Sequence, residues 1–234
     1  MPSPLLMLSF AAVTAVGAVL GWRLAGVRAR FAGVATNAPV DGLPFAAATA
    51  AAFLGVVAFV ATRPPAPASA GGAIVPTVIV AVAYLYFAAI SLLLGEIDAA
   101  THRLPNAIVL PAYPVLGALF ASACLAGGSW SAFGRAAAGG GLLFGFFWLV
   151  RAVGRGTLGG GDVKLAGVIG MVLGFAGWPA LAVGTLAAFV FGGVAAAVLL
   201  LRGKATRHTA VAFGPFLLAG AWAGLLATGA AALG

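Results

Sequence analysis

The chain has 234 residues, of which 63% are hydrophobic and only 7% charged, and it carries a formal net charge of +8. This composition excludes an ordinary soluble domain, in which about a quarter of the residues are charged. The positive charge does not indicate nucleic acid, because the basic residues are spread over several short loops, where contact with anionic membrane lipid explains them. Because the long apolar runs show no alternation, we expect an all-α, polytopic transmembrane helical bundle.

Eight apolar segments are candidates for membrane-spanning helices, each of which needs about 20 residues. They lie at about 4–22, 43–62, 73–94, 107–126, 133–153, 163–177, 179–201 and 210–232. Between the sixth and the seventh, only Gly177-Trp178-Pro179 can turn the chain. A hairpin is favoured here over a single long helix, because proline ends a helix. No soluble domain is visible, so we expect residues 1–234 to form one integral-membrane domain.

Lysine and arginine are distributed unevenly over the loops between these segments, and this distribution predicts the orientation of the bundle. Of the twelve basic residues, only Arg63 and Arg135 fall on the outer side when the N-terminus is placed outside the cell. The loops at 23–42, 95–106, 151–164 and 202–209, which carry the other basic residues, are then cytoplasmic.

Two of the four acidic residues, Asp98 and Asp162, lie at the ends of apolar segments. A charge in the membrane costs about 3 kcal/mol or more, so a membrane-edge aspartate indicates a functional site. Asp98 ends the third segment and Asp162 begins the sixth, and a bundle can bring the two together. Of two close carboxylates, one keeps a proton while the other can activate a water. Such a pair can hydrolyse a peptide bond, and we expect neither a metal nor a cofactor.

The neighbours of the two aspartates suit this chemistry. Residues 159–161 are three glycines, which give the backbone freedom and let a substrate strand pass close by. Asp162 follows them at a helix start, where unpaired N–H groups favour a carboxylate. In the other loop, Pro105 can begin the next span and Asn106 can bond exposed backbone. Thr101 shares a helical face with the first aspartate if that helix continues.

Each of these residues also has a plainer interpretation. Asp162 can be a helix cap alone, and Asp98 can form a boundary ion pair with Arg103. Lys164 and Arg103 can be orientation signals, and His102 can lie at the lipid interface. Paired carboxylates also carry protons or cations, which leaves a coupled membrane transporter as the alternative function. A transporter predicts aspartates near mid-span, whereas here both lie at the cytoplasmic edge.

Two segments resemble the motifs of the type IV prepilin peptidases, a family of bacterial inner-membrane aspartic endopeptidases. Residues 98–106 read Asp-Ala-Ala-Thr-His-Arg-Leu-Pro-Asn, which is similar to the family's Asp followed by Thr and then Leu-Pro-Asn. Residues 159–165 read Gly-Gly-Gly-Asp-Val-Lys-Leu, which is similar to its Gly-x-Gly-Asp followed by Lys-Leu. Residues 213–216, Phe-Gly-Pro-Phe, are a weaker match to the opening of its last span. These motifs lie within 95–216, and the resemblance covers about 95–234.

The resemblance implies cleavage of basic leader peptides from prepilin or pseudopilin substrates at the cytoplasmic face of the bacterial inner membrane. Asp98 and Asp162 are then the catalytic pair, and Glu96 can either bind a leader lysine or face the lipid headgroups. The supporting residues of the motifs are Gly159, Gly161, Lys164, Thr101, Pro105 and Asn106.

One departure from the family concerns the loop at 23–42. Many members carry an insertion there with two Cys-x-x-Cys pairs, and they also methylate the new N-terminus of the substrate. The loop here is short and contains no cysteine. We therefore expect a peptidase without N-methyltransferase activity, and the sequence predicts no particular oligomeric state.

Overall fold

The structure, a computed structural model, describes residue 19 and residues 74–154, 158–202 and 212–230. Within these ranges the chain forms helices and no strand, so the all-α expectation is confirmed for this part of the chain. The expected spans at about 4–22 and 43–62 lie outside the described residues, apart from residue 19. The helices are α3 (Ile74–Thr101), α4 (Asn106–Leu125), α5 (Trp130–Val153), α6 (Gly160–Ala176), α7 (Trp178–Leu201) and α8 (Gly214–Ala230).

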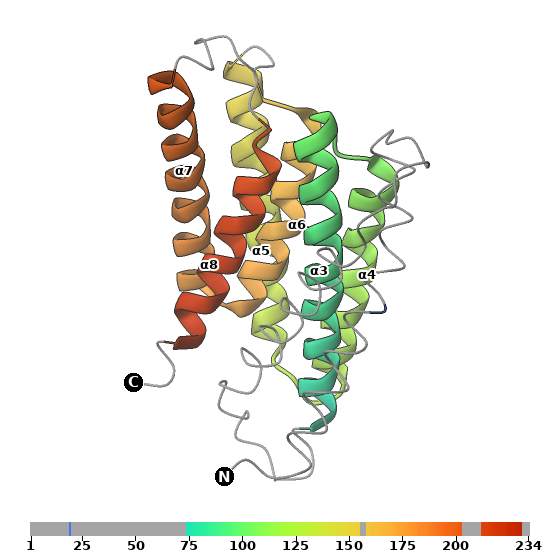
Figure 1. Cartoon of the computed structure of the whole chain (residues 1–234). Helices are drawn as coiled ribbons and strands as arrows, with labels where there is room; N and C mark the ends of the chain where they lie inside the picture. The colour runs from blue at the N-terminus through green and yellow to red at the C-terminus, as the bar shows by residue number, and fades with distance from the viewer. Residues whose placement is uncertain (1–18, 20–73, 155–157, 203–211, 231–234) are drawn as a thin grey trace.

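These helices run antiparallel to their neighbours in sequence and form a bundle (Figure 1). The ends of α3, α5 and α7 therefore lie together with the starts of α4, α6 and α8, at the upper end of the bundle in Figure 1. Four of the described helices, α3, α4, α5 and α7, are long and apolar enough to cross a membrane. The described part of the chain thus fits a membrane protein.

Helix α3 extends further than the apolar segment that predicted it. The expected span ends at residue 94, whereas the helix continues to Thr101 because Glu96, Ala99 and Ala100 are good helix formers. The residue after the helix, His102, adopts a left-handed backbone with φ of 52°. It donates its N–H to the carbonyl of Asp98. A helix of 28 residues is about 42 Å long, against about 30 Å of hydrocarbon. The last turns, with Asp98, therefore project beyond the expected span.

The hairpin expected between the sixth and seventh spans is confirmed. Gly177 separates α6 from α7 with a φ of 143°, a backbone conformation that favours glycine. Its N–H donates to the carbonyl of Leu173 at 2.9 Å, and its own carbonyl accepts from Leu181 at 3.1 Å. Pro179 lies in the first turn of α7, where its missing N–H leaves no bond unmade. Helix α6 begins at Gly160, earlier than the expected residue 163.

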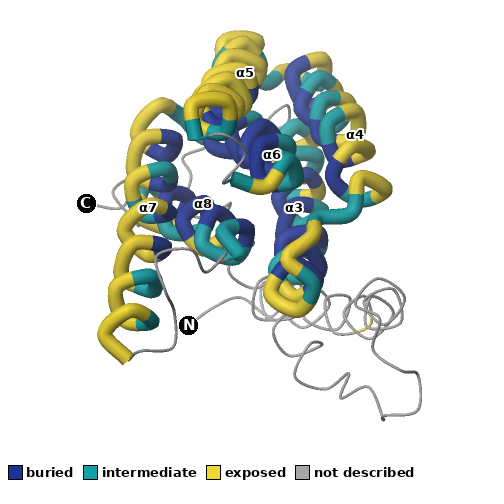
Figure 2. Tube along the Cα trace, turned by 90° about the horizontal axis from the view of Figure 1, so that it is seen from above, coloured by how far each residue is buried: buried dark blue, intermediate teal, exposed yellow. Residues whose placement is uncertain are grey.

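Helix α6 is the core of the bundle, with most of its residues buried among the other helices (Figure 2). It packs closely against α5 because small residues face each other. A Cβ on Gly139 of α5 would lie 2.5 Å from the carbonyl oxygen of Gly170, so the two backbones touch. Gly141 itself faces open space. The contact holds the middle of α6 closely against α5.

Candidate active site

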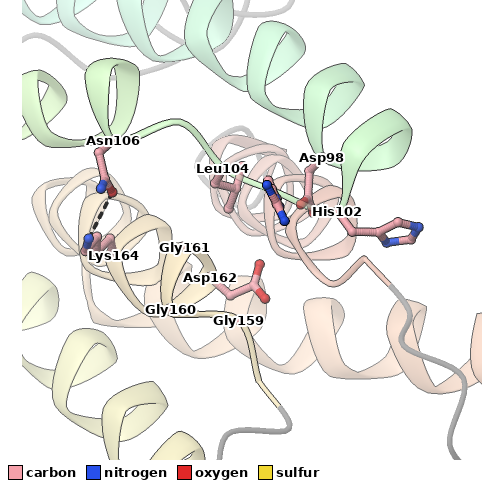
Figure 3. A pocket seen from close by; sticks show the side chains of 10 residues that line it. Asp98, His102, Leu104, Asn106, Gly159, Gly160, Gly161, Asp162 and Lys164 are labelled. Carbon is pink, nitrogen blue, oxygen red and sulfur yellow. Dashed lines mark hydrogen bonds between the residues drawn. The ribbon is translucent and has the colours of Figure 1, made fainter. Parts of the chain in front are cut away.

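A pocket of about 350 Å³ opens at the upper end of the bundle (Figure 3). Three parts of the chain form it: the end of α3, the connection from α3 to α4 with the first residue of α4, and the start of α6. The residues that line it are Asp98, His102, Arg103, Leu104, Asn106, Gly159, Gly160, Gly161, Asp162 and Lys164. The two motif segments, distant in sequence, thus share one pocket.

Asp98 lies in the last turn of α3 and is only 3% exposed. Its Oδ2 accepts a hydrogen bond of 3.0 Å from the backbone N–H of Gly214, the first residue of α8. Among the described residues it makes no ion pair with Arg103, so the boundary ion pair considered from the sequence does not form there. Burial raises the pKa of Asp98 above its usual range, whereas the Gly214 N–H and the charge of His102 lower it.

Asp162 is the third residue of α6 and is 8% exposed. The cap position belongs to Gly159, whose backbone N–H donates to the Asp162 carboxylate, as the third residue of a capping box accepts from the cap. Burial raises the pKa of Asp162 to about 6, the charge of Asp98 also raises it, and the Gly159 N–H lowers it. Asp162 therefore occupies the third position of a capping box, while burial and the charge of Asp98 disfavour its ionised form.

The two carboxyl groups are electrostatically coupled. Both side chains line the same pocket, and the negative charge of Asp98 raises the pKa of Asp162. In Figure 3 the side chain of Asp162 extends from the start of α6 towards the side of the pocket where Asp98 lies. A buried pair of this kind retains one proton over a range of pH in which isolated carboxyls have lost theirs. The arrangement can therefore act as an acid and a base at one point.

Lys164 and Asn106 connect the two motif segments directly. The Lys164 Nζ donates to Asn106 Oδ1 at 2.9 Å, which ties the second turn of α6 to the first residue of α4 (Figure 3). The hydroxyl of Tyr113 on α4 donates to the carbonyl oxygen of Lys164 at 2.6 Å. Leu104 packs against Gly161, where a Cβ would lie 2.8 Å from the Leu104 Cβ. Lys164 is therefore a structural link in this pocket as well as a positive charge.

Three of the expected supporting residues do not line the pocket. Thr101 donates to the carbonyl of Ile97 at 2.7 Å and so closes the end of α3. Pro105 occupies the cap position of α4, one residue before the helix begins. Glu96 lies on another face of α3, beside a separate hollow that Gly95, Ala99 and Ala100 also line. Of the expected supporting residues, the pocket is thus lined by Gly159, Gly161, Lys164 and Asn106.

Sequence reasoning did not assign roles to Gly214, Leu104 and Tyr113, which all contribute to the site. For Gly214 the pattern Phe213-Gly214-Pro215 was a usable indication, because it marks the start of the last helix. No pattern indicated that this start faces Asp98. Leu104 belongs to the Leu-Pro-Asn motif and Tyr113 is an ordinary aromatic residue by sequence, and only the structure shows their contacts with Gly161 and with the Lys164 carbonyl.

The described helices fit a membrane protein, and two carboxyl groups share one pocket at one end of the bundle. Residues 85–200, which contain both aspartates, match the type IV leader peptidase family. Through this segment the chain is similar to that family.

One relative is the prepilin leader peptidase/N-methyltransferase of Stutzerimonas stutzeri, which is 33% identical over 136 residues. The match covers 58% of this chain and 46% of the relative, so the chain spans about half the length of that protein. No solved structure gives a significant match.

Proposed function

We propose that the chain is an aspartic endopeptidase that removes the basic leader peptide from prepilin or pseudopilin substrates. The observation that carries this proposal is that Asp98 and Asp162 line one pocket and are coupled within it. The family match adds the reaction class, because residues 85–200 match leader peptidases. It also favours peptide hydrolysis over the coupled transporter, the alternative that the sequence left open.

The chemistry follows from the state of the pair. With one proton between the two carboxyls, the ionised group takes a proton from a water, and the water oxygen bonds to the scissile carbonyl carbon. The protonated group gives its proton to the carbonyl oxygen. When the resulting diol collapses, the bond to nitrogen breaks and the nitrogen takes up a proton from the pair.

The distribution of charge supports a pocket that faces the cytoplasm. Arg103, Arg151, Lys164 and Arg202 lie at or near the helix ends on the pocket's side, whereas Arg135 lies near the start of α5 at the other end. Positive charges are retained in the cytoplasm, so we propose a bacterial inner-membrane protein of eight spans with its N-terminus outside. A leader carrying Lys or Arg would be attracted to the two carboxylates.

We propose proteolysis alone for this chain, without methylation of the product. The relative is named as both a peptidase and an N-methyltransferase, but the single cysteine of this sequence, Cys124, is buried in α4. Cysteine pairs of the kind that many methylating members carry are therefore missing from this sequence. Incubation with a prepilin and radiolabelled S-adenosylmethionine tests the point: we expect leader removal without incorporated label, and a labelled product overturns it.

The proposed activity is tested with the purified chain in detergent and a full-length prepilin, followed by gel shift and mass spectrometry of the product. We expect the wild type to release an intact leader, and Asp98→Asn and Asp162→Asn each to reduce the rate by about a thousandfold or more, because each removes an essential proton carrier. Asp41→Asn, which changes an acidic residue outside both motifs, is the matched control and keeps the wild-type rate. Normal cleavage by either of the first two variants contradicts the proposal.

A further inference from the structure

The position of Asp98 is electrostatically unfavourable for a carboxylate. It lies in the last turn of α3, where unpaired carbonyl groups and the negative end of the helix dipole repel an anion. It is also 3% exposed, so water cannot solvate the charge fully. A buried carboxylate in such a place needs hydrogen-bond donors supplied by another element.

Helix α8 supplies such a donor at its own start. Gly214 is the first of its 17 residues, so its N–H has no partner inside the helix. This N–H donates to Asp98 Oδ2 at 3.0 Å, across 116 residues of sequence. The positive end of the α8 dipole thus faces the carboxylate that the end of α3 disfavours. The next residue, Pro215, has no N–H, which leaves Gly214 to make the contact.

The lack of space around Gly214 also restricts this position to glycine. A Cβ at this position would lie 2.5 Å from Asp98 Oδ2 and 3.1 Å from its Cγ, closer than real Cβ contacts. The start of α8 cannot simply move away, because the preceding Phe213 packs on Gly192 of α7. The Phe213 ring also lies 6.0 Å from that of Phe147 and 5.8 Å from that of Phe189. The aromatic cluster of Phe147, Phe189 and Phe213 thus holds Gly214 against Asp98.

We propose that Gly214 is a positioning residue whose N–H and missing side chain hold Asp98 in place as the ionised member of the pair, which leaves Asp162 as the initial acid. This inference rests on the proposed peptidase function for its catalytic meaning. The charge of Asp98 raises the pKa of Asp162, which agrees with this order of ionisation.

The assignment gives each proton a path. The Asp98 carboxylate takes a proton from the water as the water oxygen bonds to the scissile carbon, and the Asp162 carboxyl protonates the carbonyl oxygen. On collapse, the bond between carbon and nitrogen breaks, and the nitrogen takes the proton from Asp98. Asp162 recovers a proton from the diol, so both groups return to their starting state and one water is consumed.

The sequence allows a direct test, because the chain contains three aspartates, Asp41, Asp98 and Asp162. Protein labelled with ¹³C at the aspartate carboxyl, purified in detergent, gives one resonance for each, and the Asp→Asn variants assign them. In the wild type we expect Asp98 to lose its proton at lower pH than Asp162. In Gly214→Ala we expect the Asp98 transition to move to higher pH, because its donor is displaced.

Gly193→Ala is the matched control, since a Cβ on Gly193 meets nothing within 4 Å, and its titrations should equal those of the wild type. Phe213→Leu is the second variant, used if Gly214→Ala does not fold; it loosens the start of α8 and should move the Asp98 transition in the same direction. Cleavage kinetics add a second readout: we expect Gly214→Ala to lower kcat about a hundredfold with little change in KM.

Two outcomes overturn the inference: Asp162 ionising before Asp98 in the wild type, or an unchanged Asp98 titration in Gly214→Ala, or in Phe213→Leu where that variant replaces it. If the titrations follow expectation but the wild type cleaves no prepilin, the proposed function fails while Gly214 retains its control of Asp98. The two failures are therefore distinguishable.

Discussion

The Lys164 ammonium donates to the side-chain oxygen of Asn106 at 2.9 Å, and this bond joins the two motif segments of the pocket. Asn106 begins α4, and Lys164 lies in the second turn of α6, two residues after Asp162. The bond therefore fixes the start of α6 relative to the connection that follows Asp98. A lysine that sequence alone would assign to membrane orientation has a defined structural partner.

Breaking this link should reduce turnover without abolishing it. We expect Lys164→Met and Asn106→Ala each to lower kcat by about tenfold, because the two aspartates lose their fixed relation. The double variant should be little worse than either single one, since both remove the same bond. A double-mutant cycle of kcat/KM measures the coupling. Strictly multiplicative losses would show that the two residues act independently.

The three glycines before Asp162 should differ in their tolerance of alanine. A Cβ on Gly159 would lie 2.9 Å from Asp162 Oδ2, and one on Gly161 would lie 2.8 Å from Leu104 Cβ. On Gly160 the nearest atom would be the Arg151 guanidinium nitrogen, at an ordinary 3.5 Å. We therefore expect Gly159→Ala and Gly161→Ala to lose most cleavage activity, and Gly160→Ala to keep it. Equal losses at all three positions would point instead to a general need for chain flexibility.

Stability should depend on the charge of Asp162. The folded-state pKa of about 6 lies above the ordinary value of 3.8, so the folded chain binds this proton more tightly than the unfolded chain. The free energy of unfolding therefore falls as pH rises from about 4 to about 6 and stays lower above that range. Asp162→Asn removes this loss, so its Tm should exceed that of the wild type at pH 7.5 and match it at pH 4.

Thermal unfolding in detergent at the two pH values measures this difference, with Asp41→Asn as the control for removal of one acidic charge. A wild-type Tm above that of Asp162→Asn at pH 7.5 would mean that the ionised carboxylate is a net stabiliser of its helix start.

Cleavage should have an alkaline limit set by the same group. If Asp162 is the initial acid, kcat/KM falls as its proton leaves, with a midpoint near the pKa of about 6. The profile measured from pH 4.5 to 8.5 should therefore bend downwards within about one unit of that value. A rate that rises steadily to pH 8 would assign the acid to another group.

Hydropathy and motifs predicted much of this architecture, for physical reasons that the structure makes plain. Membrane-length apolar runs without alternation become helices because a helix satisfies its own backbone hydrogen bonds in lipid, and Gly177 with Pro179 favours a turn. The meeting of Asp98 and Asp162 follows from the antiparallel order of the helices, which brings the end of α3 and the start of α6 to the same end of the bundle. These predictions need only the local sequence and the number of times that the chain is expected to cross the membrane.

Other features depend on contacts that local sequence does not encode. Hydropathy reports lipid burial and not helical backbone, so it placed the end of α3 at residue 94 when Glu96 and the alanines extend the helix to Thr101. The contact of Gly214 with Asp98 spans 116 residues, and its requirement for glycine comes from space rather than from a turn. Glu96 was expected at the site through its nearness in sequence, but helix periodicity directs it to another face.

The pairing of the two aspartates is tested most directly by titrating the ¹³C-labelled Asp162 carboxyl in the wild type and in Asp98→Asn. We expect a midpoint near the pKa of about 6 in the wild type, and a clearly lower midpoint in Asp98→Asn, because the negative charge that raises this pKa is gone. An unchanged Asp162 midpoint would contradict the pairing.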